Sequence, residues 1–169
     1  MKTQEYTHII HPIPAFFRAD SRVLILGSFP SVKSRESGFF YGHPQNRFWK
    51  VMARLLEDDV PGTVEEKGAF LERHRIAAWD SIHACDIVGS SDASIRNVEP
   101  NDFTEILQHA EIRHIYTNGK KSHEIYRTYC FPQTGEEDIC LPSTSPANAA
   151  WTMEKLLTAW SVVKEDLYW

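Results

Sequence analysis

The sequence contains little cysteine and has no long apolar run. Among 169 residues it has three cysteines, Cys85, Cys130 and Cys140, which is an odd number without Cys-x-x-Cys spacing. This pattern argues against a disulfide framework, a zinc knuckle or an iron–sulfur cluster, and it favours a reducing compartment. No segment approaches the roughly 18 consecutive apolar residues of a membrane helix, and the first residues lack the features of a signal peptide. We expect a cytoplasmic monomer with no membrane association, no metal and no cofactor.

Two nucleotide-binding signatures are also absent, since neither GxxxxGK[ST] nor GxGxxG occurs. The chain carries 18 basic and 23 acidic side chains, a net charge of −5. Taken alone, this sign argues against a nucleic-acid partner.

The apolar pattern predicts one α/β domain over residues 1–169. Four short runs, at 22–26, 76–79, 112–116 and 138–141, are mainly apolar without strict alternation, which is typical of strands covered on both faces. Helical spacing occurs at 48–56, 103–110 and 153–163, and a more polar helix is expected over 122–129. Strands that alternate with helices predict a three-layer α/β/α fold with a central, mostly parallel four-stranded sheet.

Ligands of such sheets bind at the carboxyl ends of the strands, so the segments after each strand are the candidates for function. Gly27-Ser-Phe-Pro-Ser31 is either an ordinary tight turn or a place where a ligand approaches the backbone closely. Thr117-Asn-Gly-Lys-Lys121 is a turn whose asparagine amide is able to read a base edge. Pro142-Ser-Thr-Ser-Pro-Ala-Asn148 is either a stiff capped turn or an anion site before a helix.

Two loops add further candidates. In the segment 37–49, Phe40 or Tyr41 could stack on a planar ligand, whereas Phe39, Phe48 and Trp49 are better explained as core residues. Asn46 could be a helix N-cap or a catalytic amide. The segment 80–95 contains Asp80, Asp86 and Asp92, and we expect none of these carboxylates to contact a DNA backbone directly.

These motifs, in this order, resemble the uracil-DNA glycosylase superfamily, and most closely its hypoxanthine-DNA (deoxyinosine) glycosylase branch. The resemblance is carried by the segments 27–30, Tyr41-Gly-His-Pro-Gln-Asn-Arg-Phe-Trp49, Gly89-Ser-Ser-Asp-Ala-Ser-Ile95, 117–119 and 141–148, and it extends from about Arg22 to Trp160. It implies a base-excision enzyme that flips a deaminated base out of DNA and hydrolyses its N-glycosidic bond.

The resemblance also implies roles for individual residues. Asn46 would orient the attacking water, and Asn118 would stabilise the leaving base. Tyr41 holds the position of the stacking aromatic, with Phe40 as the alternative. The remaining residues fall into two groups: the base pocket would include Gly27, Ser28, Phe29 and Ser143, and the DNA contacts would come from Ser31, Lys120, Lys121, Thr144, Ser145, Pro146, Ala147 and Asn148.

Three positions depart from the superfamily pattern. Phe29 occupies the place where many members carry Asp or Asn, Ser143 replaces His or Asn, and Ala147 replaces a large wedge residue. These departures keep a second hypothesis open, a catalytically weak or inactive nucleic-acid-binding module of the same fold. An unrelated α/β hydrolase is disfavoured because the chain has no G-x-S-x-G elbow.

The charge is distributed unevenly along the chain. Residues 31–56 hold five basic side chains against one acidic, a net charge of +4, and residues 111–130 hold four against two, a net charge of +2. From residue 131 onward, two basic side chains face six acidic ones, a net charge of −4. The positive segments carry the proposed site motifs, so DNA remains a plausible partner, with few phosphate contacts and a shallow salt dependence.

Overall fold

Four parallel strands form the centre of the computed structural model, which describes residues 5–168. They are β2 (Val23–Gly27), β3 (Ile76–Asp80), β6 (His114–Asn118) and β7 (Asp138–Leu141), and they lie in the order β3-β2-β6-β7. The predicted four-stranded parallel sheet is therefore confirmed. The third strand begins two residues later than predicted, because the Ile112 N–H bonds back to the Ala110 carbonyl and keeps residue 112 in a turn.

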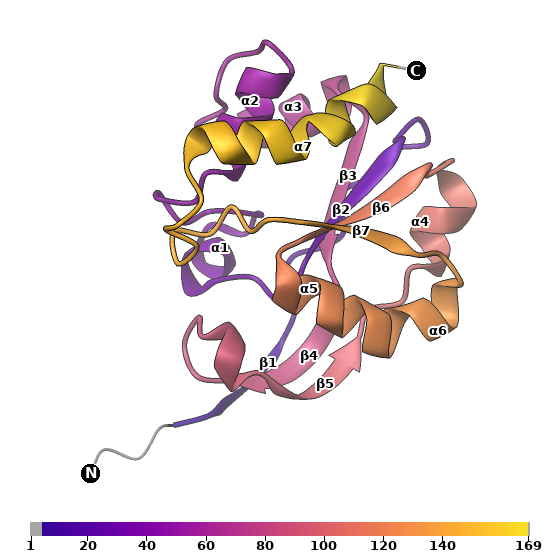
Figure 1. Cartoon of the computed structure of the whole chain (residues 1–169). Coiled ribbons are helices and arrows are strands. Elements are labelled where there is room, and N and C mark those ends of the chain that lie inside the picture. The colour runs from indigo at the N-terminus through magenta and orange to yellow at the C-terminus, as the bar shows by residue number, and fades with distance from the viewer. Residues whose placement is uncertain (1–4, 169) are drawn as a thin grey trace.

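Helices cover both faces of this sheet, which confirms the three-layer prediction (Figure 1). On one side lie α2 (Phe48–Leu55), α3 (Val64–Arg73) and α7 (Met153–Leu167). On the other lie α4 (Thr104–His109), α5 (Lys120–Ile125) and α6 (Phe131–Thr134), with a π-helical segment, Tyr126–Cys130, between the last two.

Strand β2 shows why the apolar runs are continuous. All five of its residues are buried. Val23 and Ile25 pack in one cluster with Phe48 of α2, whereas Leu24 and Leu26 pack in a second cluster with Phe103. Because successive strand residues point to opposite faces, a sheet covered on both sides needs apolar residues at every position.

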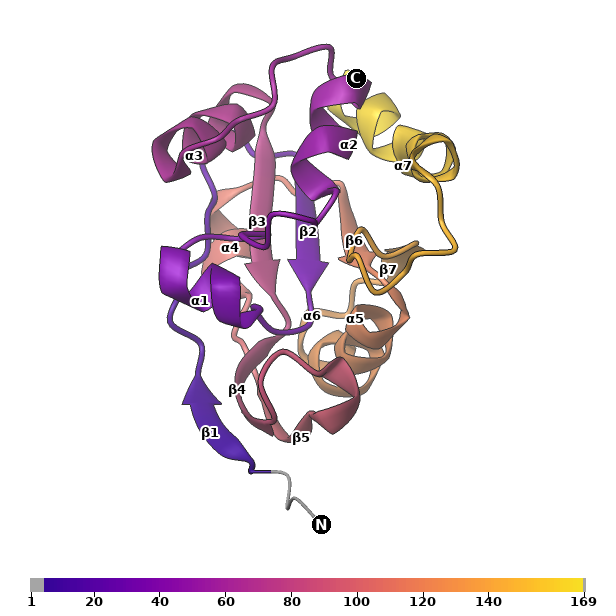
Figure 2. The same ribbon diagram turned by 90° about the vertical axis from the view of Figure 1, so that its left-hand side faces the viewer.

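A second sheet was not predicted from the sequence. It is antiparallel, with the order β1 (Thr7–Ile10), β4 (Ile82–Ile87) and β5 (Arg96–Pro100). Figure 2 shows it beyond the arrowheads of β2 and β3, and only Ser81 separates β3 from β4. Two further short helices, α1 (Val32–Ser37) and the 3₁₀ turn Asp92–Ser94, follow β2 and β4. The outer strands β1 and β5 are largely exposed, so they lack the apolar runs by which the central strands are recognised.

Candidate active site

A cavity of about 320 Å³ lies at the carboxyl edge of the parallel sheet. Gly27, Asp80 and Asn118, the last residues of β2, β3 and β6, contribute to it, together with the loops that precede α2 and α7. Its lining includes every residue predicted for the base pocket and both predicted catalytic asparagines. Among the predicted DNA contacts, it includes Ser31, Thr144, Ser145, Pro146 and Ala147, whereas Lys120, Lys121 and Asn148 lie outside it.

Thr144 joins the two asparagines, which lie 72 positions apart in the sequence. Its hydroxyl donates to Oδ1 of Asn46 at 2.8 Å and accepts from Nδ2 of Asn118 at 3.0 Å. Its backbone N–H donates to Oδ1 of Asn118 at 3.0 Å. Thr144 is fully buried, so these hydrogen bonds are shielded from solvent and hold both amides in fixed orientations.

The hydrogen bonds also define which way the Asn46 amide points. Oδ1 of Asn46 accepts from the Phe48 N–H at 3.0 Å as well as from Thr144. A backbone N–H is always a donor, so the atom facing it must be the oxygen. With both lone pairs of Oδ1 occupied, Asn46 offers the cavity the N–H groups of Nδ2, and within residues 5–168 these have no hydrogen-bond partner. The N-cap interpretation of Asn46 is wrong by one position, because Arg47 is the N-cap of α2, but the Asn46 oxygen does accept from the first N–H of that helix.

Arg47 fixes the loop that leads into α7. Its guanidinium donates to the carbonyls of Ser145 at 3.2 Å and Asn148 at 3.1 Å, and also to that of Trp151. Its backbone N–H bonds to the Thr144 carbonyl at 3.0 Å. This cation, counted in the sequence as part of a positive segment, is therefore used to hold one loop against another.

Sequence reasoning missed the two carboxylates of the cavity, Asp80 and Asp92. Asp80 is 4% exposed, and its Oδ2 accepts a hydrogen bond from Nε2 of His11 at 2.7 Å. Nδ1 of His11 accepts from the Ile13 N–H at 3.2 Å, which places the ring proton on Nε2. The other oxygen, Oδ1, lies 2.3 Å from the position that a Cβ on Gly27 would occupy. Only glycine leaves room for this carboxylate over the end of β2.

Tyr41 reaches the same part of the cavity. Its φ of 52° is a left-handed conformation that a bulky residue rarely adopts, and its ring stacks on Phe48 with 4.0 Å between centroids. Burial, and then the negative charge of Asp80, raises the pKa of the Tyr41 hydroxyl far above its ordinary value. Among residues 5–168 no partner meets this buried hydroxyl at hydrogen-bond geometry, but Asn118 lies near enough to oppose the rise in its pKa. The hydroxyl therefore keeps its proton at the buried end of a side chain that lines the cavity.

Asp92 lies at the rim of the cavity. The residue as a whole is exposed, but its carboxyl group is crowded by protein atoms, and its Oδ1 accepts from the Ser28 hydroxyl at 3.1 Å. Burial raises the pKa of this carboxyl, the Asp80 charge adds to the increase, and the Ser28 hydrogen bond and nearby Lys121 oppose it. The segment 89–95 was noted in the sequence for its resemblance to the superfamily, but no role was assigned to Asp92.

The three predicted DNA contacts that lie outside the cavity have other surroundings. Lys120 is exposed and Lys121 is half-buried near Asp92. Asn148 donates from Nδ2 to the Ser143 carbonyl at 3.0 Å, and so it stabilises the loop 143–148 internally.

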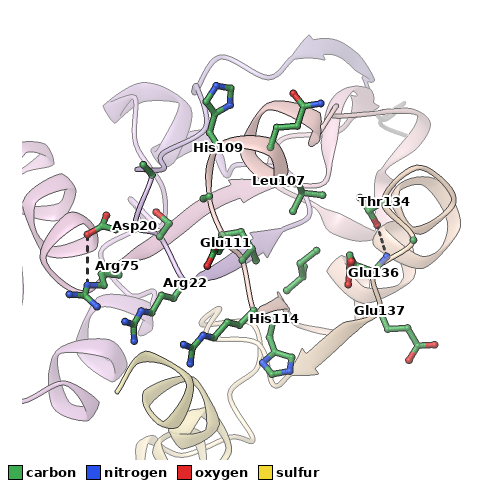
Figure 3. A pocket seen from close by; sticks show the side chains of 18 residues that line it. Asp20, Arg22, Arg75, Leu107, His109, Glu111, His114, Thr134, Glu136 and Glu137 are labelled. Carbon is green, nitrogen blue, oxygen red and sulfur yellow. Dashed lines mark hydrogen bonds and ion pairs between the residues drawn. The ribbon is translucent and has the colours of Figure 1, made fainter. Parts of the chain in front are cut away.

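A larger hollow of about 1270 Å³ lies at the opposite, amino-terminal edge of the sheet (Figure 3). Charges of both signs line it, and Asp20 pairs with Arg75 at 3.8 Å. No residue predicted for the site lies there. Because ligands of parallel sheets bind at the carboxyl edge, the smaller cavity is the candidate active site.

Among residues 5–168, no group of three or more His, Cys, Asp or Glu side chains is arranged to hold a metal ion. Across the same residues, no helix is long and apolar enough to cross a membrane.

The fold and the site together define the class of protein. It is a three-layer α/β/α protein with a cavity at the strand ends. Amides, hydroxyls and aromatic rings line this cavity, and such a lining suits a small planar polar ring. The family model for the uracil DNA glycosylase superfamily matches residues 14–165. The chain belongs to that superfamily.

Individual relatives agree with this assignment. A hypoxanthine DNA glycosylase from Methanosarcina acetivorans is 33% identical over 144 residues, which cover 84% of this chain and 90% of the relative. Another, from Methanosarcina barkeri, is 31% identical over 113 residues, 66% of this chain and 72% of the relative. The solution NMR structure of a candidate uracil DNA glycosylase from Methanosarcina acetivorans is similar with a TM-score of 0.80 and 31% identity, and the match covers 95% of this chain and all of that one.

Proposed function

We propose that this protein is a monofunctional DNA glycosylase that releases hypoxanthine from DNA, with uracil and related deaminated bases as secondary substrates. The observation that carries the proposal is the buried Thr144 link between Asn46 and Asn118 on the wall of a cavity of about 320 Å³. This volume is at the lower end of the ~300–1,000 Å³ usual for small-molecule sites, and it suits a single flipped base. The two relatives named as hypoxanthine DNA glycosylases support the choice of base.

In the proposed reaction, the bond between C1′ of the deoxyribose and the base nitrogen breaks, and the electron pair leaves with the base. The oxygen of a water molecule bonds to C1′, and the proton that this water loses neutralises the departing base. The transition state has oxocarbenium character at the sugar and growing negative charge on the base. Donors aimed at the base therefore lower the barrier most effectively.

Asn118 is the proposed donor to the leaving base, since one N–H of its Nδ2 bonds to Thr144 and the second is available. Asn46 faces the cavity with N–H groups, so it holds the oxygen of the attacking water or of the sugar rather than accepting a proton. An amide is too weak a base to deprotonate water, and positioning with charge stabilisation must supply the rate. No lysine lines the cavity, so the product is an abasic site without a Schiff-base lyase step.

The proposed DNA contacts surround the cavity mouth. Loop 143–148 would grip the target strand through Ser143, Thr144 and Ser145, with Pro146, Ala147 and Asn148 beside the space left by the flipped base. Ser31, Lys120 and Lys121 would face phosphates. We further propose that the protein acts as a cytoplasmic monomer and that residues 1–169 form one domain.

The test is excision from duplexes that contain inosine or uracil, followed by alkali cleavage at abasic sites. We expect release of hypoxanthine first and uracil second, and loss of release in Asn46→Ala with DNA binding retained. Binding of inosine-containing DNA without any abasic product would instead establish the inactive binding module, which Phe29 on the cavity wall and Ser143 favour. Absence of both binding and cleavage would refute the proposal.

A further inference from the structure

The cavity holds two carboxyl groups in different surroundings. Asp80 lies on the floor, where it is 4% exposed and accepts a hydrogen bond from His11 at 2.7 Å. Asp92 lies at the rim, and among residues 5–168 its carboxyl group has one hydrogen-bond partner, Ser28. When two carboxyl groups share a site, the group whose charge is less well stabilised keeps its proton and is the better acid. Asp92 is therefore the candidate acid of this cavity.

The charges around Asp92 favour its protonated form. Burial raises the pKa of its carboxyl group and the negative charge of Asp80 adds to the increase, against the opposing effects of the Ser28 hydrogen bond and of Lys121. The thiol of Cys85, on β4, also lies near Asp92, and it stays protonated because burial raises its pKa to about 11. Lys121 is a proposed phosphate contact. A bound DNA strand would therefore neutralise the cation that opposes protonation of Asp92.

The Ser28 hydrogen bond determines which oxygen of Asp92 carries the proton. The Ser28 hydroxyl donates to Oδ1 at 3.1 Å, so Oδ1 is the carbonyl oxygen of the acid form and Oδ2 bears the proton. Oδ2 has no hydrogen-bond partner among residues 5–168. The acid form thus has one O–H group for a ligand, while Ser28 holds the other oxygen just beyond the end of β2.

A flipped purine has a proton acceptor at the depth of Asp92. The sugar is bonded to N9 of the imidazole ring, so the six-membered ring enters the cavity first and the imidazole ring stays near the mouth. Asp92 lies at this mouth, close to Lys121. N7 of the imidazole ring carries a lone pair that accepts a proton. The corresponding edge of uracil has C–H groups at positions 5 and 6, which accept none.

We propose that Asp92 is a general acid that protonates N7 of hypoxanthine as the base leaves. The bond between C1′ and N9 breaks, its electron pair passes into the base, and the proton of Asp92 Oδ2 bonds to N7. Hypoxanthine therefore departs as a neutral molecule. The oxygen of water bonds to C1′, and the proton that this water loses restores the acid form of Asp92 through solvent. This inference rests on the proposed function and adds a catalytic residue to it.

Single-turnover release from inosine and uracil duplexes, with the protein in saturating excess, tests the proposal across a range from about pH 5 to about pH 8. We expect wild-type release of hypoxanthine to slow as pH rises, because the acid form of Asp92 is lost. Asp92→Asn should release hypoxanthine about 100-fold more slowly near pH 5, and the two rates should converge at higher pH. Release of uracil should differ by less than about threefold at every pH, because uracil has no N7 to protonate.

Asp86→Asn is the matched control, because Asp86 pairs with His8 at 2.8 Å and lies outside the cavity. It should keep the wild-type pH profile for both bases. Ser28→Ala provides a second test that leaves the acid in place and also serves if Asp92→Asn does not fold. Loss of the Ser28 hydrogen bond raises the pKa of Asp92 further, so the decline in hypoxanthine release should move to higher pH.

The outcomes separate this inference from the proposed function. A wild-type pH profile for hypoxanthine release in Asp92→Asn refutes the general acid and leaves the glycosylase activity established. An equal loss of hypoxanthine and uracil release in this variant refutes it as well, because the effect would then not depend on N7. If the wild-type protein releases neither base, the proposed function itself fails, and the general acid fails with it.

Discussion

The hydroxyl of Thr144 donates to the amide oxygen of Asn46 and accepts from the amide nitrogen of Asn118. One side chain on the loop before α7 therefore orients a residue that precedes α2 and a residue at the end of β6. The two proposed catalytic amides behave as one unit, and disturbing Thr144 should affect both.

Thr144→Val keeps the shape of the side chain and removes its hydroxyl. We expect the single-turnover rate of hypoxanthine release to fall about 100-fold, since small misplacements of catalytic groups have effects of this size. The free energy of unfolding should fall by about 1–3 kcal/mol, because a buried amide nitrogen loses its acceptor. Thr144→Ser retains the hydroxyl and should keep most of the activity. Equal rates for Thr144→Val and wild type would show that the link has no role in catalysis.

Gly27→Ala tests the close packing of Asp80 against β2. The added Cβ would lie 2.3 Å from Asp80 Oδ1, so the carboxylate must move away from the cavity floor. We expect weaker binding of inosine DNA and a loss of about 1–3 kcal/mol of stability, measured by urea unfolding. Gly62→Ala is the control, because no atom lies within 4 Å of its Cβ position, and it should leave both quantities unchanged or raise stability slightly.

Arg47→Lys tests the clamp on the loop before α7. A lysine ammonium cannot reproduce the planar fork that spans the carbonyls of Ser145, Asn148 and Trp151. We expect faster amide hydrogen exchange over residues 145–151 and about tenfold lower kcat/KM, because the loop carries Thr144. Arg54→Lys changes an exposed arginine of α2, the helix that follows Arg47. It should alter neither the hydrogen exchange of residues 145–151 nor kcat/KM. Unchanged exchange in Arg47→Lys would contradict the prediction.

Asp92→Asn should make stability less dependent on pH. An acid whose pKa is raised by folding binds its proton more tightly in the folded state, so wild-type stability falls as pH rises from the ordinary value of 3.8 through the higher folded pKa. The neutral amide avoids this loss. Urea midpoints should therefore coincide most closely near pH 4 and separate toward pH 7, with the variant more stable. A constant difference across this range would contradict the assignment.

Sequence patterns were sufficient to predict the parallel sheet, and they also bring the proposed site residues to one edge of it. Strands β2 and β3 are buried on both faces, which makes their apolar runs continuous, and the strand-end rule indicates Gly27 and Asn118, which the structure places on the cavity wall. Asp80 also ends a strand, but its placement in the cavity wall depends on a histidine 69 positions away and on the missing side chain of Gly27. Such a convergence is a property of the fold and leaves no local signal.

The count of charges along the sequence was a less reliable guide to DNA contacts, because the fold also decides what each cation contacts. Arg47 contributes to the positive balance of residues 31–56, yet its guanidinium is occupied by backbone carbonyls. Arg35 of the same segment donates to the Gly89 carbonyl at 3.0 Å. A count of cations in a sequence gives an upper limit for the phosphates that they can neutralise, because some of them serve the protein itself.

His11 lies outside the part of the chain that the family model matches, which begins at residue 14. The donor to the Asp80 carboxylate comes from the segment just after β1, so the matched range does not contain every residue that holds the cavity in place. A chain shortened to residues 14–165 would keep every motif and leave this carboxylate without its partner, at a cost of about 3–5 kcal/mol for a buried pair. Swapping leading segments between homologues would then change how this carboxylate is held in the cavity wall, even though no motif residue had changed.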